Sequence, residues 1–428
     1  MACYRCKPKV QRMQHPMAVI TGIGAVTPLG PDIRSSWDAL CAGRSGIAPV
    51  SGFDAAGLRT RVAGQIPGFD PLACTDARTA HRYDRFILLA LAAAHMALAD
   101  AGLEIGPRNA ERIGVAAGNS LAGAATIEAA AQRVAAEGNA ARLSPFTIPG
   151  SIGSMSAGLV AMATGARGPN LGLNAGCASS AAALGQALDW LRLGRADAVL
   201  AGGSEAALCR HVFCAYASLK ATTARNDDPA GASRPFDAGR DGFVPAEAGV
   251  FLVVERLETA RARGARILCE LAGYGTACDA YHPTRPDPEG RACIRCMESA
   301  LADAGLGPAD VDMVSAHGTS TPANDVTEAM AIRAVLGERA RRVPVTANKS
   351  MTGHTIGAAG ALQAAFAVLS LRSGVVPPTI NLDHPDPECA LDLDTTARAR
   401  SMRVALSNSF AFGGVNSSLV LRLPREAS

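Results

Sequence analysis

Three short segments each place one reactive side chain among small neighbours. Cys177 lies in Asn-Ala-Gly-Cys-Ala-Ser-Ser, His317 in Ala-His-Gly-Thr-Ser-Thr-Pro, and His354 in Lys-Ser-Met-Thr-Gly-His-Thr-Ile-Gly-Ala-Ala-Gly. Glycine and other small residues allow a substrate to approach the backbone closely. A thiol that acts with two neutral imidazoles can carry out covalent acyl transfer, in which the thiol receives an acyl group and the imidazoles stabilise charge on a second thioester.

The elements around these residues must bring the three side chains together. Cys177 stands between a strand-like run, residues 169–173, and a helix of small residues, so we expect its thiol at a helix N-terminus, where the dipole favours thiolate. We expect His354 at the start of a similar helix, where the same dipole favours the neutral imidazole. Taken singly, a free cysteine often serves as a small core residue, and a histidine as a satisfied one. Their occurrence together favours catalysis.

The sequence that follows Cys177 is echoed after His354. Residues 178–188 and 355–366 both predict helices that lack a polar face, which must be buried on all sides. Further strands are expected at residues 18–24, 112–116, 198–202, 249–254, 267–275 and 313–315.

Strands that alternate with helices predict a layered α/β fold made of two similar halves. We expect a disordered leader over residues 1–16, an N-terminal half over 17–265 that carries the nucleophile, and a C-terminal half over 266–428 that carries both histidines.

Composition excludes several classes of protein. A net charge of +3 on 428 residues is too small to indicate nucleic-acid binding, and the apolar run at residues 86–99 is too short to span a membrane. Twelve cysteines without a secretory signal predict reduced thiols in a cytoplasmic protein. Two Cys-x-x-Cys pairs have zinc-like spacing. Cys3 and Cys6 lie in the basic leader, and Cys293 and Cys296 lie in a helical pattern, so we expect no metal.

The motifs closely resemble those of the β-ketoacyl-acyl carrier protein synthases, in the elongating type II class of the thiolase-like superfamily, over residues 17–424. They are Val-Ile-Thr-Gly-Ile-Gly (19–24), the segment around Cys177, Gly-Gly-Ser-Glu (202–205), Ser-Arg-Pro-Phe-Asp (233–237), Arg-Asp-Gly-Phe (240–243), Asp-Ala-Tyr-His (279–282), the loops around His317 and His354, Pro-Pro-Thr-Ile-Asn-Leu (377–382) and Asn-Ser-Phe-Ala-Phe-Gly-Gly (408–414). The resemblance implies a duplicated, five-layered αβαβα fold, a homodimer and no resident cofactor.

The resemblance also implies a decarboxylating Claisen condensation. An acyl chain would pass from the phosphopantetheine of an acyl carrier protein to Cys177, with the backbone N–H groups of Cys177 and Phe412 as an oxyanion hole. Malonyl-acyl carrier protein would then lose CO2 while His317 and His354 hold its thioester oxygen. The carbanion would attack the acyl thioester and give a β-ketoacyl chain longer by two carbons. The sequence does not say which histidine also assists decarboxylation.

Further residues match positions with known roles in that family. Lys349 matches the active-site lysine, Thr319 and Thr321 match residues that bind the pantetheine arm, and Arg142 and Lys220 match basic positions that dock the acidic carrier protein. Asp325 and Glu328 are expected to make supporting polar contacts. The acyl pocket and its gate are implied at Asn119, Ser120, Leu121, Tyr216, Phe410, Ala411 and Gly413.

Two residues depart from the family pattern. Gln363 stands where a glutamate is usual, which predicts altered electrostatics near the lysine and histidines. Ala411 replaces the first glycine of a Gly-Phe-Gly-Gly gating loop, and its Cβ removes access to positive φ, so we expect narrower gate motion. These changes leave both fatty acid and polyketide or polyene assembly open.

The alternative is a partner subunit that determines chain length in a heterodimer and has little activity alone. Such subunits lack the nucleophile, so the retained Cys177 favours a catalyst.

Overall fold

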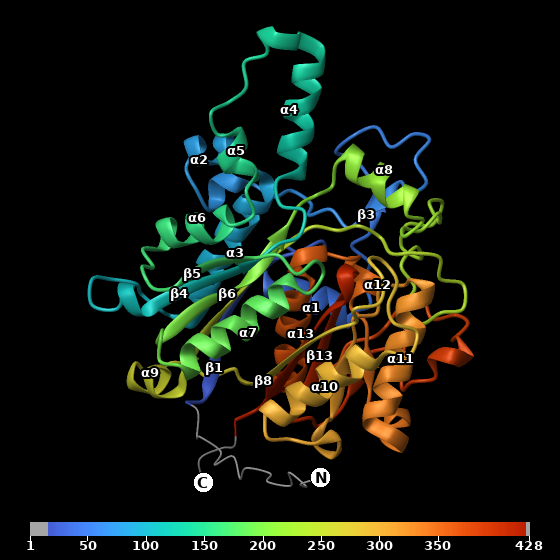
Figure 1. Cartoon of the computed structure of the whole chain (residues 1–428). Helices are drawn as coiled ribbons and strands as arrows, with labels where there is room; N and C mark the ends of the chain where they lie inside the picture. The colour runs from blue at the N-terminus through green and yellow to red at the C-terminus, as the bar shows by residue number, and fades with distance from the viewer. Residues whose placement is uncertain (1–15, 425–428) are drawn as a thin grey trace, which may run out of the picture.

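The computed structural model describes residues 16–424, and its main feature is a sheet of ten strands in the order β10-β9-β13-β14-β8-β1-β7-β6-β4-β5 (Figure 1). The strands are β1 (Ala18–Val26), β4 (Ile113–Gly118), β5 (Asn170–Leu173), β6 (Ala198–Glu205), β7 (Ala248–Arg256), β8 (Cys269–Cys278), β9 (Met313–Ser315), β10 (Val345–Thr346), β13 (Val404–Ala411) and β14 (Val415–Arg422). The predicted leader, apart from Pro16, and with it Cys3 and Cys6, lies outside the described residues.

The sheet consists of two halves with the same topology. β1 and β8 pair at the centre through two residue pairs, Val19 with Glu270 and Ile20 with Cys269. From there each half runs outward through two antiparallel pairings and then two parallel ones, as β1-β7-β6-β4-β5 and as β8-β14-β13-β9-β10. β5 is therefore equivalent to β10. The predicted division after residue 265 falls between α9 (Leu257–Ala262) and β8.

Helices complete five layers (Figure 1). α7 (Ser179–Arg192) and α13 (Ala359–Ser373) pack between the halves of the sheet. α3 (Arg85–Ala101) and α6 (Met155–Thr164) cover one outer face, and α10 (Arg291–Asp303) and α11 (Pro322–Leu336) cover the other. The remaining helices are α1 (Ile33–Cys41), α2 (Ala77–Arg82), α4 (Ala124–Glu137), α5 (Thr147–Ser151), α8 (Arg210–Ser218), α9 and α12 (Lys349–Thr352).

Alternate residues of each strand explain the layers. On β7, Val250 and Leu252 join the central core around α7 and α13, whereas Phe251 and Val253 join the core under α3. Successive side chains of a strand point to opposite faces, so a strand that is apolar throughout is buried on both. The thiolase-like α/β fold that the sequence predicts is confirmed.

The two central helices approach each other closely because their contact residues are small. A Cβ built on Gly360 of α13 would lie 2.6 Å from the backbone nitrogen of Ala181 on α7. Ile356–Ser373, which contains α13, is apolar enough over its 18 residues to cross a membrane, but 83% of it is buried inside the molecule. It is therefore a core helix, as predicted for the small-residue segment at residues 355–366.

The hairpin of β13 and β14 was not among the predicted strands. Its residues pair from Val404 with Arg422 to Ala411 with Val415. Serine and asparagine occupy several of its buried positions, which hides the apolar pattern that usually marks a strand. Short strand pairs complete the fold: β2 (Ala48–Pro49) with β3 (Val62–Ala63), and β11 (Val375–Val376) with β12 (Arg398–Ala399).

Candidate active site

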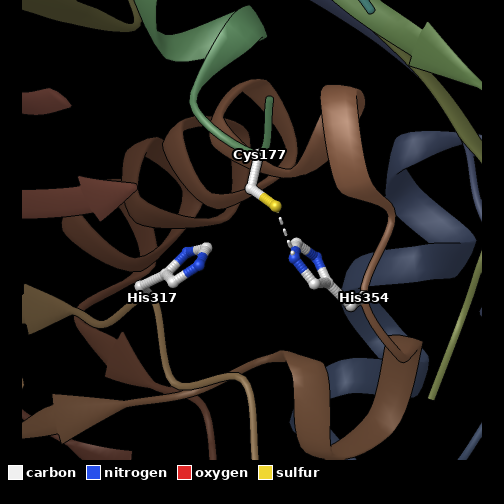
Figure 2. Close-up of side chains that lie close together, drawn as sticks. All are labelled: Cys177, His317 and His354. Atoms are coloured by element: carbon white, nitrogen blue, oxygen red, sulfur yellow. Dashed lines mark hydrogen bonds between the residues drawn. The ribbon is translucent and has the colours of Figure 1, made fainter. Parts of the chain in front are cut away.

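The structure brings Cys177, His317 and His354 together (Figure 2). Cys177 follows β5, His317 follows β9, and His354 lies between α12 and α13. Because β5 and β10 are equivalent strands, the loops before α7 and α13 meet where the two central helices begin. The thiol and one ring nitrogen of each histidine lie within 4.8 Å of one another.

His354 presents one ring nitrogen to the thiol. Its Nε2 lies 3.1 Å from Cys177 Sγ, and its Nδ1 accepts a hydrogen bond of 3.2 Å from the backbone N–H of Ile356. The neutral ring therefore carries its proton on Nε2. Burial, followed by the charge of Lys349, holds the imidazole pKa well below its ordinary value. The sequence predicts that a helix dipole lowers this pKa, but α13 begins only at Ala359. Burial and the Lys349 charge lower it instead.

His317 is buried beside His354, with ring centroids 5.4 Å apart and planes at 85°. Burial, then the charges of Lys349 and His354, hold its pKa well below the ordinary value. Within the described residues, its buried Nδ1 has no hydrogen-bond partner. The backbone N–H groups of His317 and Gly318 donate to Glu328 at 2.8 and 2.7 Å, so this carboxylate positions the loop as expected.

Lys349 is buried and is hydrogen-bonded to the backbone of the loop that carries His317. Its Nζ donates to the carbonyl of His317 at 2.5 Å and to Gln363 Oε1 at 2.7 Å. Gln363 Nε2 donates to the carbonyls of Ala316 and Asn408 at 2.9 and 2.8 Å. Burial lowers the lysine pKa to about 8. A neutral amide therefore stands where a carboxylate would stabilise the ammonium.

The Cys177 thiol differs from the sequence prediction. Burial raises its pKa to about 12, and Glu205 acts in the same direction, while the charge of Lys349 opposes them. The prediction that Cys177 is a thiolate is therefore wrong for the resting protein. α7 begins two residues later, at Ser179, and its N-terminus does not overcome desolvation. The thiolate that forms during attack has the Nε2–H of His354 and the charge of Lys349 to stabilise it.

Glu205 is a site residue that the sequence analysis quoted in a motif without assigning it a role. Its Oε2 accepts hydrogen bonds from the backbone N–H groups of Ser120 at 2.8 Å, Leu121 at 3.2 Å and Gly357 at 3.3 Å. It thereby joins the loop after β4 to the start of the α13 segment. Burial raises its pKa to about 7. The sequence signal that could have identified Glu205 was its place at the end of a predicted buried strand, in Gly-Gly-Ser-Glu.

A cavity of about 450 Å³ opens onto the three reactive residues. The predicted residues that line it are Ser120, Leu121, Tyr216, Lys220, Thr319, Thr321, Phe410, Ala411, Phe412 and Gly413. Asn119 does not line the cavity. Its side-chain Nδ2 instead donates a hydrogen bond of 2.8 Å to the carbonyl of Gly153. Arg142 is exposed away from the cavity wall, whereas Lys220 is exposed at it.

Phe243 is a further wall residue, which the sequence analysis quoted in the motif at residues 240–243 without assigning it a role. Its ring packs edge-on against Tyr216 at 5.1 Å and against His354 at 5.4 Å. The hydroxyls of Thr319 and Thr321 lie 2.9 Å apart on the same cavity wall as His317.

The gate does not need positive φ at Ala411. This residue ends β13 in extended conformation, with φ −123°. The left-handed positions are Gly413 at φ 80° and Gly414 at φ 70°, which have no Cβ to clash. The expected loss of positive φ therefore has no effect in this conformation. Phe410 is buried and Phe412 is 45% exposed at the cavity.

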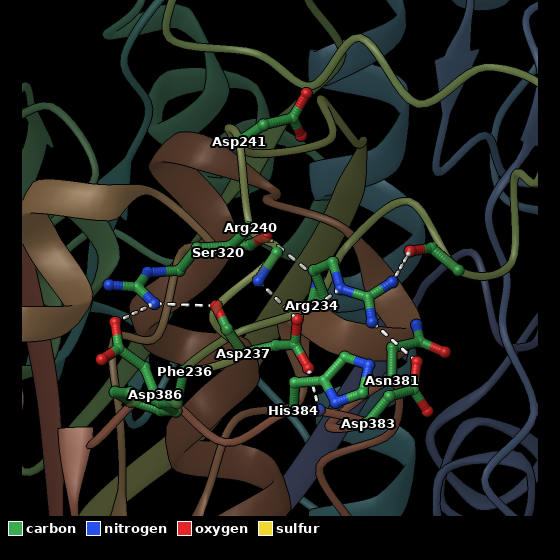
Figure 3. A network of polar contacts seen from close by, with 12 residues as sticks. Arg234, Phe236, Asp237, Arg240, Asp241, Ser320, Asn381, Asp383, His384 and Asp386 are labelled. Carbon is green, nitrogen blue, oxygen red and sulfur yellow. Dashed lines mark hydrogen bonds and ion pairs between the residues drawn. The ribbon is translucent and has the colours of Figure 1, made fainter. Parts of the chain in front are cut away.

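A network of ion pairs around two buried arginines holds the loop that carries the two threonines (Figure 3). Arg234 pairs with Asp237 at 2.9 Å and Asp383 at 2.7 Å, and its backbone N–H donates to Ser320. Arg240 pairs with Asp386 at 2.7 Å and donates to the carbonyl of Thr321. The network explains why the motifs at residues 233–237 and 240–243 accompany the histidine loop.

A duplicated α/β sheet in which the loops before the two central helices and the loop after β9 bring one thiol and two neutral imidazoles into a cavity defines a thiolase-like condensing enzyme. Comparison with known proteins agrees. Residues 17–260 match the N-terminal domain of the β-ketoacyl synthases, and residues 268–383 match their C-terminal domain. The chain therefore belongs to the β-ketoacyl synthase family, and it is an acyltransferase, as predicted.

Individual relatives cover nearly the whole chain. The 3-oxoacyl-[acyl-carrier-protein] synthase 2 of Synechocystis is 45% identical over 405 residues, which are 94% of this chain and 97% of that protein. The ishigamide ketosynthase/chain length factor has a TM-score of 0.90 at 34% identity, covering 96% of this chain and 100% of that one. AntDE:AntF, a type II polyketide synthase carrier protein in complex with its ketosynthase bound to the hexaketide, has a TM-score of 0.88 at 35% identity, with the same coverage.

Proposed function

We propose that this enzyme condenses an acyl chain held on Cys177 with malonyl-acyl carrier protein and so elongates the chain by two carbons. The observation that carries the proposal is the position of one thiol between two imidazoles in a cavity of about 450 Å³. A hydrolase would need one histidine and an orienting group, whereas two neutral imidazoles suit an enolate.

The first step is acyl transfer. The Cys177 sulfur forms a bond to the acyl carbon, the bond to the pantetheine sulfur breaks, and the thiol proton passes to the departing pantetheine thiolate. The backbone N–H groups of Cys177 and Phe412 would stabilise the oxyanion of the tetrahedral intermediate. Both residues line the cavity, which supports this assignment.

The second step is decarboxylation of the malonyl thioester. Its carboxylate leaves as CO2, and the electron pair passes into the thioester, whose oxygen would accept hydrogen bonds from His354 Nε2–H and from His317. The enolate carbon then attacks the acyl carbon, the enolate oxygen returns to a thioester carbonyl, and the Cys177 thiolate leaves and takes up one proton from solvent water. Neutral imidazoles donate to the developing enolate without giving up a proton. We assign assistance to CO2 loss to both histidines jointly.

We propose that the condensation itself uses no resident cofactor, because the phosphopantetheine is carried by the acyl carrier protein. The hydroxyls of Thr319 and Thr321 would contact its arm, and Arg142 and Lys220 would dock the acidic carrier protein. Lys220 is exposed at the cavity, which supports a docking role.

Replacing Lys220 by glutamate should raise KM for malonyl-acyl carrier protein several-fold and leave KM for malonyl-pantetheine, which has no carrier protein, unchanged. The reason is that the added repulsion acts on the docking protein and not on the arm. Steady-state kinetics with both substrates measures this. The matched control is Arg195→Glu, at an exposed basic residue that does not line the cavity. An unchanged KM for the carrier-bound substrate removes Lys220 from the docking surface.

We further propose a cytoplasmic homodimer. Three of the similar solved structures contain a ketosynthase with a carrier protein or a chain length factor, so a partner subunit of a heterodimer is the second candidate function. The retained nucleophile supports the catalyst. Both fatty acid and polyketide or polyene assembly fit the site, and the elongating condensation is common to them.

Intact-protein mass spectrometry of the isolated chain with acyl- and malonyl-acyl carrier proteins tests the assignment. We expect an acyl adduct and an extended product with the native protein, and neither with Cys177→Ala. Cys214→Ser, at an exposed cysteine of α8, is the control and should keep both. Product that forms only after a second synthase-like subunit is added would favour the partner role.

A further inference from the structure

A second group of metal-ligating side chains lies apart from the catalytic residues, between α4 and α8. Cys209 is the residue before α8, His211 lies in its first turn, and Glu128 lies on α4, which projects from the body of the molecule (Figure 1). His211 Nδ1 is 3.0 Å from Glu128 Oε2 and 3.6 Å from Cys209 Sγ. All three atoms lie within 4.8 Å of one another.

The spacing of these atoms is close to that of zinc ligands. Zn²⁺ bonds of about 2.3 Å to sulfur, 2.0 Å to nitrogen and 2.1 Å to oxygen, in a tetrahedron, separate sulfur from nitrogen by about 3.6 Å and nitrogen from oxygen by about 3.4 Å. The sulfur–nitrogen distance in the structure, 3.6 Å, already has this value. The nitrogen–oxygen distance is 3.0 Å, so the Glu128 carboxylate must move slightly away from His211. We propose that Cys209, His211 and Glu128 bind one Zn²⁺ ion, with water as its fourth ligand.

The surroundings of the three side chains support a built site. The backbone N–H of His211 also donates to Glu128 Oε2 at 3.3 Å, so the carboxylate is already oriented toward the helix start. Cys209 is buried, whereas the His211 side chain is 51% exposed, which leaves a path for the ion and its water. Sulfur and imidazole ligands favour Zn²⁺ over Mg²⁺ or Ca²⁺, which prefer oxygen.

An ion here would join α4 to α8 behind the wall of the cavity. Cys209 belongs to a small apolar cluster with Ala124 and Val212, and Leu121 and Tyr216 pack against it. Leu121 and Tyr216 also line the cavity. The ion would therefore fix a part of the wall without contacting any reacting atom.

Titration of the reduced, metal-free protein with Co²⁺ alone under anaerobic conditions tests the site. A thiolate ligand gives cobalt a charge-transfer absorption in the near ultraviolet, and tetrahedral coordination gives visible bands. We expect both to saturate at one equivalent and to disappear when Zn²⁺ is added. Cys209→Ser should abolish the thiolate absorption, and Glu128→Gln and His211→Ala should weaken Co²⁺ binding at least tenfold.

Two controls separate this site from other thiols. Cys177→Ala removes the catalytic thiol, which also lies near two histidines, and Cys214→Ser removes an exposed thiol of the same helix α8. Both variants should keep the full absorption. The proposal would be overturned if the thiolate absorption were lost in Cys177→Ala or persisted in Cys209→Ser. It would also be overturned if the native protein gave no such absorption with millimolar Co²⁺. Because Cys209 is buried, Cys209→Ser could fail to fold. His211→Ala, at an exposed residue, then tests the site, and an unchanged Co²⁺ affinity in that variant also overturns the proposal.

Discussion

At the scale of single residues, burial and then the charge of Lys349 keep the catalytic imidazoles neutral. Both causes hold the pKa of His317 and of His354 well below the ordinary histidine value. The condensation should therefore lose no activity through histidine protonation as the pH falls from 8 to the ordinary histidine pKa of about 6.5. A pH profile of kcat/KM measures this. An acidic limb centred on the ordinary histidine pKa would contradict the assignment.

Lys349 sets the alkaline limb at the same scale, with the neutral amide of Gln363 as its hydrogen-bond partner. Burial lowers the Lys349 pKa to about 8, so the ammonium is lost as the pH rises through that value. In Gln363→Glu a carboxylate adjoins Nζ and raises this pKa, so the alkaline limb of malonyl decarboxylation should move to higher pH. Gln363→Met, which adds no charge, should not move it upward. Identical pH-rate profiles for native protein and Gln363→Glu would refute the role of the amide.

At the scale of elements, the contact between α7 and α13 places the thiol beside His354. Gly360→Ala puts a Cβ 2.6 Å from the backbone nitrogen of Ala181, so the helices must separate. We expect a loss of about 1–3 kcal/mol of unfolding free energy and reduced condensation. Urea unfolding and kinetics measure the two effects. Gly106→Ala, where a Cβ meets no atom within 4 Å, should change neither, and equal effects at the two positions would contradict the argument.

At the scale of the whole molecule, β5 is an edge strand, with no further strand beside it among the described residues. α6 packs against β5, and α5 packs against α6 (Figure 1). Exposed apolar side chains lie on these three elements and directly after α5, namely Ile148, Ile152, Met162 and Leu171. A strand edge flanked by apolar side chains favours association, which supports the proposed homodimer.

Met162→Asp should shift the protein from dimer to monomer in sedimentation velocity, because it buries a charge in the proposed interface. Leu72→Asp changes another exposed apolar residue, which lies outside α5, α6 and β5 and is 57% exposed against 67% for Met162, and it should leave the dimer intact. A native protein that sediments as a monomer at micromolar concentration would exclude the homodimer.

The amino-acid sequence by itself determined the α/β class, the duplication and the three reactive residues, because glycine-rich turns and apolar helices are local patterns. Strand periodicity found β1, β4 and β9, but not the hairpin of β13 and β14, whose buried serines and asparagines disguise it. The tertiary structure alone decided the protonation states and the positions of supporting groups. Burial and the distance to Lys349 set the pKa values of Cys177 and His354, and residues far apart in the chain determine both. Desolvation depends on everything packed around a group, which no local pattern records.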